Sequence, residues 1–345
     1  MYRADRGNAQ LALYAGAALD DAGRRDEAVA VWSLGDDADP ALRRVKDNGA
    51  VHPLMREHSA RADMAMREFF TNLHARAMDD FVGSTGAEIG RVRDAIWSLT
   101  HDRPFKYETP DQKPTVFYMP GLPAAPVFDN TQIPWVSALE SAFGDIKAEY
   151  EAAASDESAM TPYVPANTPS RDWAKLRGTL DWSAIYLFKD SRSTDHIRKF
   201  PKTLAALEKT DLVRIGGVPM EVFFSRLTPG AHIPPHFGLT NTRLTVHLPL
   251  IIPETCAIRV GKDECVWRPG EIIAFDDSFE HEAWNRSDSD RVVLIFEAHH
   301  PDLSGAERQA IEYAYAVRRH WLNARTVLLG WHHWDIEAPT PPSSW

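Results

Sequence analysis

The chain has 345 residues and a formal net charge of −11, from 38 Lys and Arg against 49 Asp and Glu. Hydrophobic residues make up 44% and charged residues 25%, which is typical of a globular protein with a sizeable core and excludes global disorder. The length fits one large domain or two ordinary ones. Because an acidic surface repels phosphate backbones and anionic lipids, we expect no nucleic-acid partner.

The sequence shows no sign of membrane insertion or secretion. It has no apolar run long enough to cross a bilayer, and we expect no secretory signal at the charged residues 1–7. The two cysteines, Cys256 and Cys265, are too few for a disulfide framework. We therefore expect a cytoplasmic protein with reduced thiols.

The first hundred residues have a helical pattern. Apolar residues recur at helical spacings over 8–45, with a break at 20–23, and this stretch resembles one tetratricopeptide repeat. A single repeat cannot bury its own face, so either it docks on the next helices or further repeats lie upstream. The helical pattern continues over 56–98. We assign 1–100 to a helical, tetratricopeptide-like region, and whether it binds a partner stays open.

The next segment changes character. Prolines recur through 101–134 and forbid long helices, while Pro134 suits the first turn of a helix reaching about Ala154. Residues 155–180 are polar and proline-rich, as in a loop. We assign 101–179 to a connecting segment with one helix.

From Trp182 onward the pattern predicts short strands between turns. The predicted strands are 183–188, 221–227, 243–252, 257–260, 272–275 and 292–296. Short strands of this kind favour a sandwich or barrel over a parallel sheet. We assign 180–302 to this β domain and 303–345 to a C-terminal helix, over 306–327, and a tail. The fold class is α+β.

Two histidines in the β domain stand where a strand meets a loop. His236 follows the turn 229–235, and His281 lies within 275–284. Such positions suit ligands at the mouth of a barrel, and two imidazoles from distant strands suit Fe(II). Ten residues after His281, Arg291 opens an apolar strand. A buried guanidinium there needs a carboxylate or phosphate partner.

Strand alternation adds further residues to the same interior. On 243–250, Arg243, Thr245 and His247 share one face, opposite an apolar face. Ser225, on the strand 221–227, supplies a hydroxyl. Each of these residues alone is compatible with an ordinary structural role. Together they favour a metal site that also takes a chelating dicarboxylate.

These residues carry a resemblance to a known family. The stretches 225–248 and 275–282, followed by Arg291, resemble the aspartyl/asparaginyl β-hydroxylase family of Fe(II)/2-oxoglutarate-dependent dioxygenases over roughly residues 180–302. The segment from Gln112 to Trp135 also resembles bacterial members. The resemblance implies a double-stranded β-helix, a cupin-like jelly roll, with metal ligands at His236 and His281. It implies 2-oxoglutarate contacts at Trp182, Ser225, Thr245, His247 and Arg291.

Two positions with characteristic residues in such oxygenases are occupied here by Gly238 and Thr245. Gly238 stands two residues after His236, where the facial triad of such oxygenases usually has a carboxylate, and this family typically lacks that acid as well. Its peptide hydroxylases tend to show Arg-x-Arg-x-His, whereas here the second arginine is Thr245. Arg243 remains as the candidate substrate-binding residue, and an aspartyl or asparaginyl substrate is left open.

The resemblance implies a dioxygenase that uses Fe(II), 2-oxoglutarate and O₂, with His236, His281 and Arg291 as its catalytic set. The expected reaction hydroxylates an unactivated C–H, for example a β-carbon of an amino-acid side chain in a peptide or protein. A small-molecule or lipid substrate stays open, as does the oligomeric state. The alternatives are a cupin-like non-redox metal-binding protein, a halogenase on the same scaffold, and an interaction protein built on the helical region. Acids flanking His281, namely Asp276, Asp277 or Glu282, are candidate partners of the metal ligands.

Overall fold

The structure, a computed structural model, describes residues 8–168 and 172–330, and predictions on 1–7, 169–171 and 331–345 lie outside the described residues. The chain divides into two compact units. The helical unit combines the chain up to Lys106 with the chain from Gln309 onward, and the sheet unit is Tyr107–Arg308. The four-part division made from the sequence stays a prediction.

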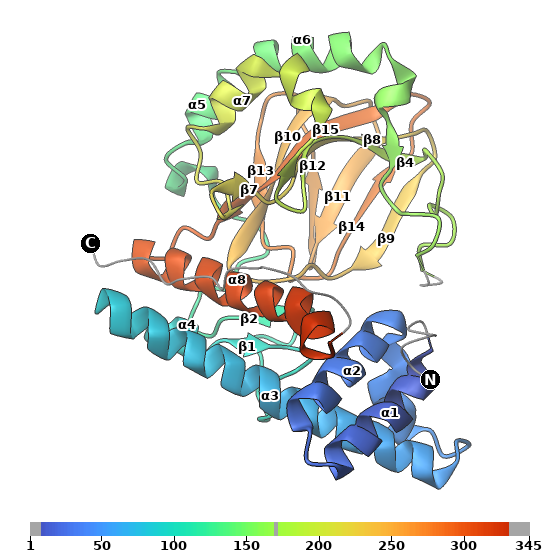
Figure 1. Cartoon of the computed structure of the whole chain (residues 1–345). Coiled ribbons are helices and arrows are strands. Elements are labelled where there is room, and N and C mark those ends of the chain that lie inside the picture. The colour runs from blue at the N-terminus through green and yellow to red at the C-terminus, as the bar shows by residue number, and fades with distance from the viewer. Residues whose placement is uncertain (1–7, 169–171, 331–345) are drawn as a thin grey trace. The chain divides into compact units, whose positions relative to one another are not determined.

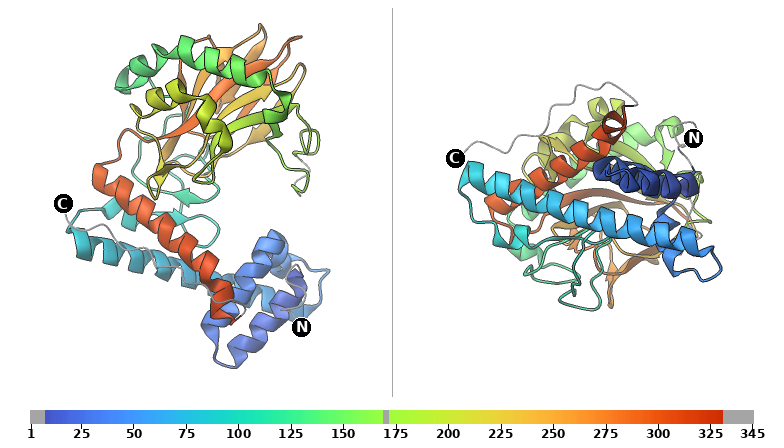
Figure 2. Two further views of the ribbon diagram at one scale, coloured as in Figure 1. Left: turned by 45° about the horizontal axis from the view of Figure 1, so that its top comes forward. Right: turned by 60° about the horizontal axis from the view of Figure 1, so that its bottom comes forward.

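The helical unit is a set of helices around an apolar core. Its elements are α1 (Ala9–Asp21), α2 (Arg25–Ala38), η2 (Pro40–Asp47), α3 (Pro53–Thr85), α4 (Gly90–Arg93), the short β1 (Ile96–Trp97), and most of α8 (Gly305–Leu328). Gly23, at φ 75°, separates α1 from α2 at the predicted break. Figure 2 shows α8 running beside α3, and there Trp321 contacts Phe69 and Phe70, with ring centroids 4.7 and 5.1 Å apart. The tetratricopeptide resemblance stays a prediction.

Two predicted helices have different bounds in the structure. The predicted helix over 56–98 ends at Thr85, because Gly86 adopts φ 67° and its N–H donates to the Val82 carbonyl, a left-handed cap, and from there to residue 98 only the short α4 is helical. The predicted helix from Pro134 to Ala154 is divided into α5 (Val136–Glu140) and α6 (Phe143–Ala154). Between them the Ser141 hydroxyl donates to the Ser137 carbonyl at 2.7 Å, a contact that competes with regular helix geometry.

The two main sheets of the sheet unit are antiparallel, and the short strands β6 (Arg214–Ile215) and β7 (Val218–Pro219) form a separate pair. The strands of the larger sheet are β3 (Thr161–Pro162), β4 (Trp182–Lys189), β5 (Arg192–Ser193), β8 (Val222–Leu227), β10 (Arg243–Ile251), β13 (Ile273–Phe275) and β15 (Arg291–His299). Their order is β13-β10-β15-β8-β4-β3, with β5 beside β4. The smaller sheet contains β9 (His232–His236), β11 (Cys256–Val260), β12 (Asp263–Val266) and β14 (His281–Asn285), in the order β12-β11-β14-β9.

The path of the chain from β8 to β15 defines the fold. Successive strands pass from one sheet to the other at almost every connection, so that four strands of each sheet alternate along the sequence. This antiparallel arrangement is the double-stranded β-helix, or jelly roll. The predicted α+β class with a cupin-like jelly-roll core is therefore confirmed.

The two faces of the larger sheet pack against different partners. Helices α5, α6 and α7 (Pro201–Leu207) cover its outer face (Figure 1), where Leu244, Val246, Leu248 and Leu250 of β10 enter an apolar core. The opposite face looks toward the smaller sheet. The alternation predicted for 243–250 is thus confirmed, because a strand places successive side chains on opposite faces.

Several short strands of this unit were not predicted from the sequence pattern. The strands β9, β12 and β14 are among these, and the segment containing Pro234 and Pro235 of β9 was interpreted as a turn. Proline is tolerated in β9 because that strand lies at the sheet edge. The remaining short elements are β2 (Phe117–Tyr118), η3 (Asn130–Gln132), η4 (Glu157–Ala159) and η5 (Asp195–Lys199).

The proline-rich segment after Tyr107 supports two loops of the jelly roll. The Lys113 N–H donates to the Ser278 carbonyl at 2.7 Å, and the Thr115 N–H donates to the Gly238 carbonyl at 3.0 Å. The absence of a long helix, predicted for 101–134, is confirmed. No helix among the described residues combines the length and apolarity needed to cross a membrane.

Candidate functional site

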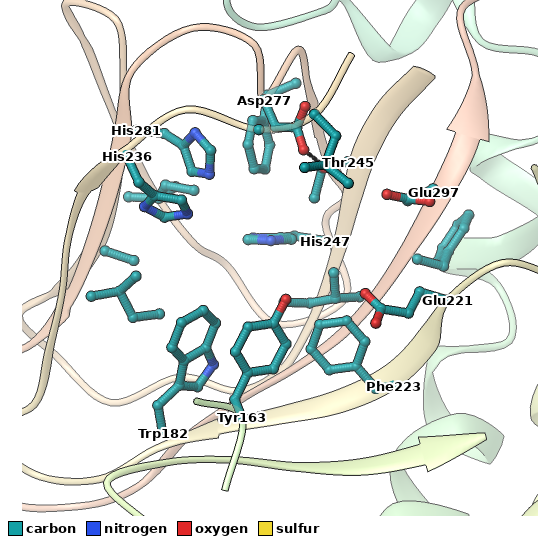
Figure 3. Close-up of a pocket in the computed structure, with 18 of the residues that line it drawn as sticks. Tyr163, Trp182, Glu221, Phe223, His236, Thr245, His247, Asp277, His281 and Glu297 are labelled. Carbon is teal, nitrogen blue, oxygen red and sulfur yellow. Dashed lines mark hydrogen bonds between the residues drawn. The ribbon is translucent and has the colours of Figure 1, made fainter. Parts of the chain in front are cut away.

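A cavity of about 380 Å³ lies between the two sheets of the jelly roll. Figure 3 shows His236 and His281 on one side of it, Glu221 and Glu297 on the other, and His247 between them. The rings of Tyr163 and Trp182 form another wall. All of these residues belong to the sheet unit.

The two predicted metal ligands face each other across neighbouring strands. The register of β14 and β9 pairs His281 with His236, and their ring centroids lie 4.0 Å apart. Nδ1 of His236 donates to the Pro234 carbonyl at 2.8 Å, and Nδ1 of His281 donates to the Phe279 carbonyl at 3.0 Å. Because a carbonyl only accepts, each neutral ring keeps its proton on Nδ1 and a lone pair on Nε2.

Burial makes both imidazoles ready to bind a metal. It lowers the pKa of His236 to about 3, with a further contribution from His281, and it lowers the pKa of His281 to about 4. Neutral imidazole is the form that coordinates divalent ions. Residues 8–168 and 172–330 contain no cluster of three or more His, Cys, Asp or Glu side chains suited to a metal, so this site offers two histidines.

Arg291 is a buried cation with unused donors. Its side chain is fully buried, and Nη1 donates to Ser225 Oγ at 3.1 Å, while the guanidinium lies 4.5 Å from the Trp267 ring centroid. Among the described residues, Nε and Nη2 have no hydrogen-bond partner. Burial lowers the pKa of Arg291 to about 10, so the group is still charged near neutral pH. A ligand carboxylate fits these open donors.

Ser225 and Trp182 hold the guanidinium in place. Ser225 Oγ accepts from Trp182 Nε1 and from Arg291 Nη1, both at 3.1 Å, and Ser225 is fully buried. Trp182 lines the cavity and stacks on Tyr163, with ring centroids 3.8 Å apart. The structure therefore brings Trp182, Ser225 and Arg291 together as the sequence predicted. Direct contact with a cosubstrate stays a prediction.

His247 and Thr245 reach the cavity from β10. Nδ1 of His247 accepts from Trp267 Nε1 at 3.3 Å, so the proton of the neutral ring is on Nε2. Burial and the neighbouring Arg291 hold the pKa of His247 well below its ordinary range. Thr245 Oγ1 donates to Asp277 Oδ2 at 3.2 Å. Both residues line the cavity, as predicted from their shared strand face.

Arg243, the candidate substrate-binding residue, lies behind this wall. Its side chain is 5% exposed, and Nη1 lies 3.0 Å from Oε2 of Glu297 and 2.8 Å from the Met220 sulfur. Glu297 lines the cavity, whereas Arg243 is not part of its lining. The structure thus places Arg243 as the partner of a cavity carboxylate.

Asp277 occupies space that a side chain at position 238 would need. A Cβ built on Gly238 would lie 2.0 Å from Cγ of Asp277, and the Gly238 N–H donates to the Asp277 carbonyl at 2.6 Å. Burial raises the pKa of Asp277 to about 6. A side chain at position 238 is therefore excluded by the Asp277 carboxyl group, which comes from the loop between β13 and β14.

The other two acids flanking His281 contact different groups. Asp276 accepts from the Gln112 side chain at 2.8 Å. Glu282 accepts from Arg259 Nε at 2.7 Å and contacts His232 at 2.8 Å. The interpretation of these acids as direct partners of the metal ligands is corrected, because Nδ1 of each ligand histidine bonds a backbone carbonyl instead.

Glu221, Glu297, Tyr163 and Trp173 are among the cavity residues that the sequence analysis missed. Glu221 and Glu297 had a detectable signal, because strand alternation puts them on the same faces as Ser225 and Arg291. Tyr163 and Trp173 had none, because both lie in the stretch 155–180, which was interpreted as a loop. The Trp173 ring lies 5.1 Å from the His236 ring in an edge-on arrangement.

Part of the chain is similar to known proteins. Residues 140–301 match the family described as Aspartyl/Asparaginyl beta-hydroxylase. Aspartyl/asparaginyl beta-hydroxylase of Mus musculus is 40% identical over 141 residues, which is 39% of this chain and 18% of that protein. Ornithine lipid ester-linked acyl 2-hydroxylase of Rhizobium tropici is 35% identical over 174 residues, 49% of this chain and 59% of that protein. Aspartate beta-hydroxylase domain-containing protein 2 of Xenopus tropicalis is 33% identical over 216 residues, 60% of this chain and 56% of that protein.

The chain thus covers less than two thirds of the length of each of these relatives. Among solved structures, a predicted oxalate decarboxylase of Thermotoga maritima matches with a TM-score of 0.24 and 11% identity, over 34% of this chain and 80% of that one. A sugar phosphate isomerase of a cupin superfamily from Silicibacter pomeroyi matches with a TM-score of 0.26 and 16% identity, over 42% and 74%. At such scores, the fold assignment rests on the strand order itself.

Proposed function

We propose that the chain, whose residues 140–301 match the aspartyl/asparaginyl β-hydroxylase family, is an Fe(II)- and 2-oxoglutarate-dependent dioxygenase that hydroxylates an unactivated C–H bond. One observation carries the proposal. A buried guanidinium with two unused donors and a pair of neutral histidines share one cavity. These are a carboxylate anchor and a metal site for a single chelating cosubstrate.

The histidines would hold the metal through Nε2. Their Nδ1 bonds to backbone carbonyls fix both the tautomer and the ring orientation, which limits the reorganisation needed for binding. Bound there with O₂ and 2-oxoglutarate, Fe(II) would supply oxidation of a C–H bond coupled to decarboxylation of 2-oxoglutarate to succinate.

Other residues would bind and orient 2-oxoglutarate. Arg291 would pair with one carboxylate of 2-oxoglutarate, and Ser225 and Trp267 keep the guanidinium in place. His247 offers an Nε2–H donor and no charge, because burial and Arg291 disfavour its protonation. The rings of Tyr163 and Trp182 exclude water from this side of the cavity.

The test is an anaerobic visible spectrum of the purified protein, titrated with Fe(II) and then with 2-oxoglutarate. We expect a charge-transfer band that is absent in His281→Ala. In Arg291→Ala the band should form only at a 2-oxoglutarate concentration on the order of a hundredfold higher, since a buried ion pair is lost. Arg268→Ala is the matched control, because Arg268 is 73% exposed. It should behave as the unmodified protein does.

Two results would contradict the proposal. The first is an unchanged 2-oxoglutarate requirement in Arg291→Ala. The second is iron binding with no band on addition of 2-oxoglutarate, which would favour the alternative of a cupin-like non-redox metal-binding protein. A halogenase would be separated from a hydroxylase by a halide-dependent product.

A further inference from the structure

Two carboxylates lie side by side on the cavity wall opposite the histidines. The register of β8 and β15 pairs Val222 with Phe296, so the adjacent residues Glu221 and Glu297 lie at the same end of the wall. On the other side of β15, Glu297 is paired with the uncharged Thr245. Figure 3 shows both carboxyl groups turned toward the cavity.

Negative groups outnumber positive ones at this end of the cavity. Lys189, Asp190, Asp277 and Arg243 are the other charged groups that act on the pair. Arg243 pairs with Glu297 at 3.0 Å, whereas Glu221 forms no ion pair with any described residue. Burial, reinforced by Glu297, raises the pKa of Glu221 to about 7. The wall therefore has an unmet demand for positive charge.

Two further observations point to a ligand in this space. Oδ1 of Asp277 is buried and has no hydrogen-bond partner among the described residues, although the residue lines the same cavity. Aromatic rings flank Glu221, with Tyr163 and Phe223 centroids 5.3 Å apart. The faces of such rings attract cations, and the rings exclude the water that would otherwise solvate the carboxylates.

We propose that the substrate presents a cationic group, an alkylammonium or a guanidinium, to Glu221 and Glu297, while the carbon to be hydroxylated lies nearer the histidines. This inference rests on the proposed function, because it assigns the substrate class of the same site. An anionic group placed here would meet two carboxylates, and a neutral group would leave Glu221 without a partner. Glu221 is thus a specificity-determining residue.

The cation has two chemical sources. One is a Lys or Arg side chain within a peptide, and the other is a free small amine. The test uses both, with isothermal titration calorimetry of the anaerobic protein loaded with Fe(II) and 2-oxoglutarate. The peptide probes are capped glycine pentapeptides with a central Lys, Arg, norleucine or Glu. The small probes are butylamine, butanol and butyrate.

We expect the unmodified protein to bind the cationic member of at least one set about tenfold more tightly than its neutral and acidic counterparts. Glu221→Gln should remove this preference, and Glu221→Asp should restore part of it. Glu264→Gln, at an exposed glutamate of β12, is the matched control and should keep the preference. A preference in the peptide set identifies a side chain as the source, and one in the small set identifies a free amine.

The inference is overturned if no set favours its cation, if no probe binds, or if Glu221→Gln keeps the preference. The charge-transfer band separates this failure from failure of the proposed function. That band should form in Glu221→Gln as in the unmodified protein, which also shows that the variant is folded. If the band is absent from the unmodified protein, the proposed function fails instead.

Discussion

Burial shifts the pKa values of basic and acidic cavity residues in opposite directions. It lowers the pKa of His236 to about 3 and raises that of Glu221 to about 7, so both side chains shift toward the neutral form. Arg291 stays charged because its pKa falls only to about 10. The interior thus combines two neutral histidines with one fixed cation, as the proposed binding of a metal and a chelating dicarboxylate would require.

Gly238 and Asp277 are expected to be coupled. Gly238→Ala places a Cβ about 2.0 Å from the Asp277 carboxyl carbon, so the carboxyl group must move, at a cost of about 1–3 kcal/mol in the free energy of unfolding. Adding Asp277→Ala should recover most of this loss. Urea unfolding of the two single variants and the double variant measures the coupling. Additive losses would contradict the contact.

At the scale of elements, strand pairing assembles the site. Strands β9 and β14 are edge and inner strands of one sheet, and their register places His236 opposite His281. Strand β10 sends Thr245 and His247 to the cavity, while its alternate residues enter the core beneath α5–α7. Thr245 and His247 therefore rest on a strand whose other face is anchored by packing, which restricts the movement of these two side chains.

Helix packing in the helical unit predicts opposite effects of one substitution at two glycines. At Gly35 of α2, an added Cβ would lie 2.4 Å from the Ala12 Cβ of α1, so Gly35→Ala should lower the free energy of unfolding by about 1–3 kcal/mol. At Gly83, an exposed site in α3 with nothing within 4 Å, Gly→Ala should raise it by up to about 1 kcal/mol. Urea midpoints distinguish the two. Equal effects would contradict the close approach of α1 and α2.

His74 makes α3 sensitive to acid. Burial lowers its pKa to about 4, while its Nε2 contacts the Val92 carbonyl at 2.9 Å. The unfolded chain binds a proton at a higher pH than the folded one, so stability is full above about pH 6.5 and falls as the pH drops toward 4, by about 3 kcal/mol. Urea unfolding between pH 7 and 4 should show this dependence, and His74→Gln should reduce it. An unchanged slope would contradict the assignment.

At the scale of the whole molecule, ligand binding should raise the free energy of unfolding. A ligand that binds only the folded state adds about 2.7 kcal/mol at a concentration of 100 times its Kd. Mn(II), a redox-inactive stand-in for Fe(II), together with 2-oxoglutarate should therefore raise the melting temperature and slow amide exchange in β9 and β14. His281→Ala should lose both effects. An equal rise of the melting temperature in His281→Ala would mean that the metal binds at another site.

The sequence alone determined the strand faces on which the candidate site residues lie, and it predicted which of them carry the chemistry. His236, His281 and Arg291 stand out by residue type and spacing, and period-two alternation assigned Thr245 and His247 to the interior, because side-chain direction along a strand is a local property. Only the tertiary structure paired His236 with His281, aligned Glu221 with Glu297, placed Asp277 against Gly238 and brought Tyr163 and Trp173 into the wall. These contacts depend on strand register and loop paths between segments far apart in the chain, and the free energy of packing the whole core selects them.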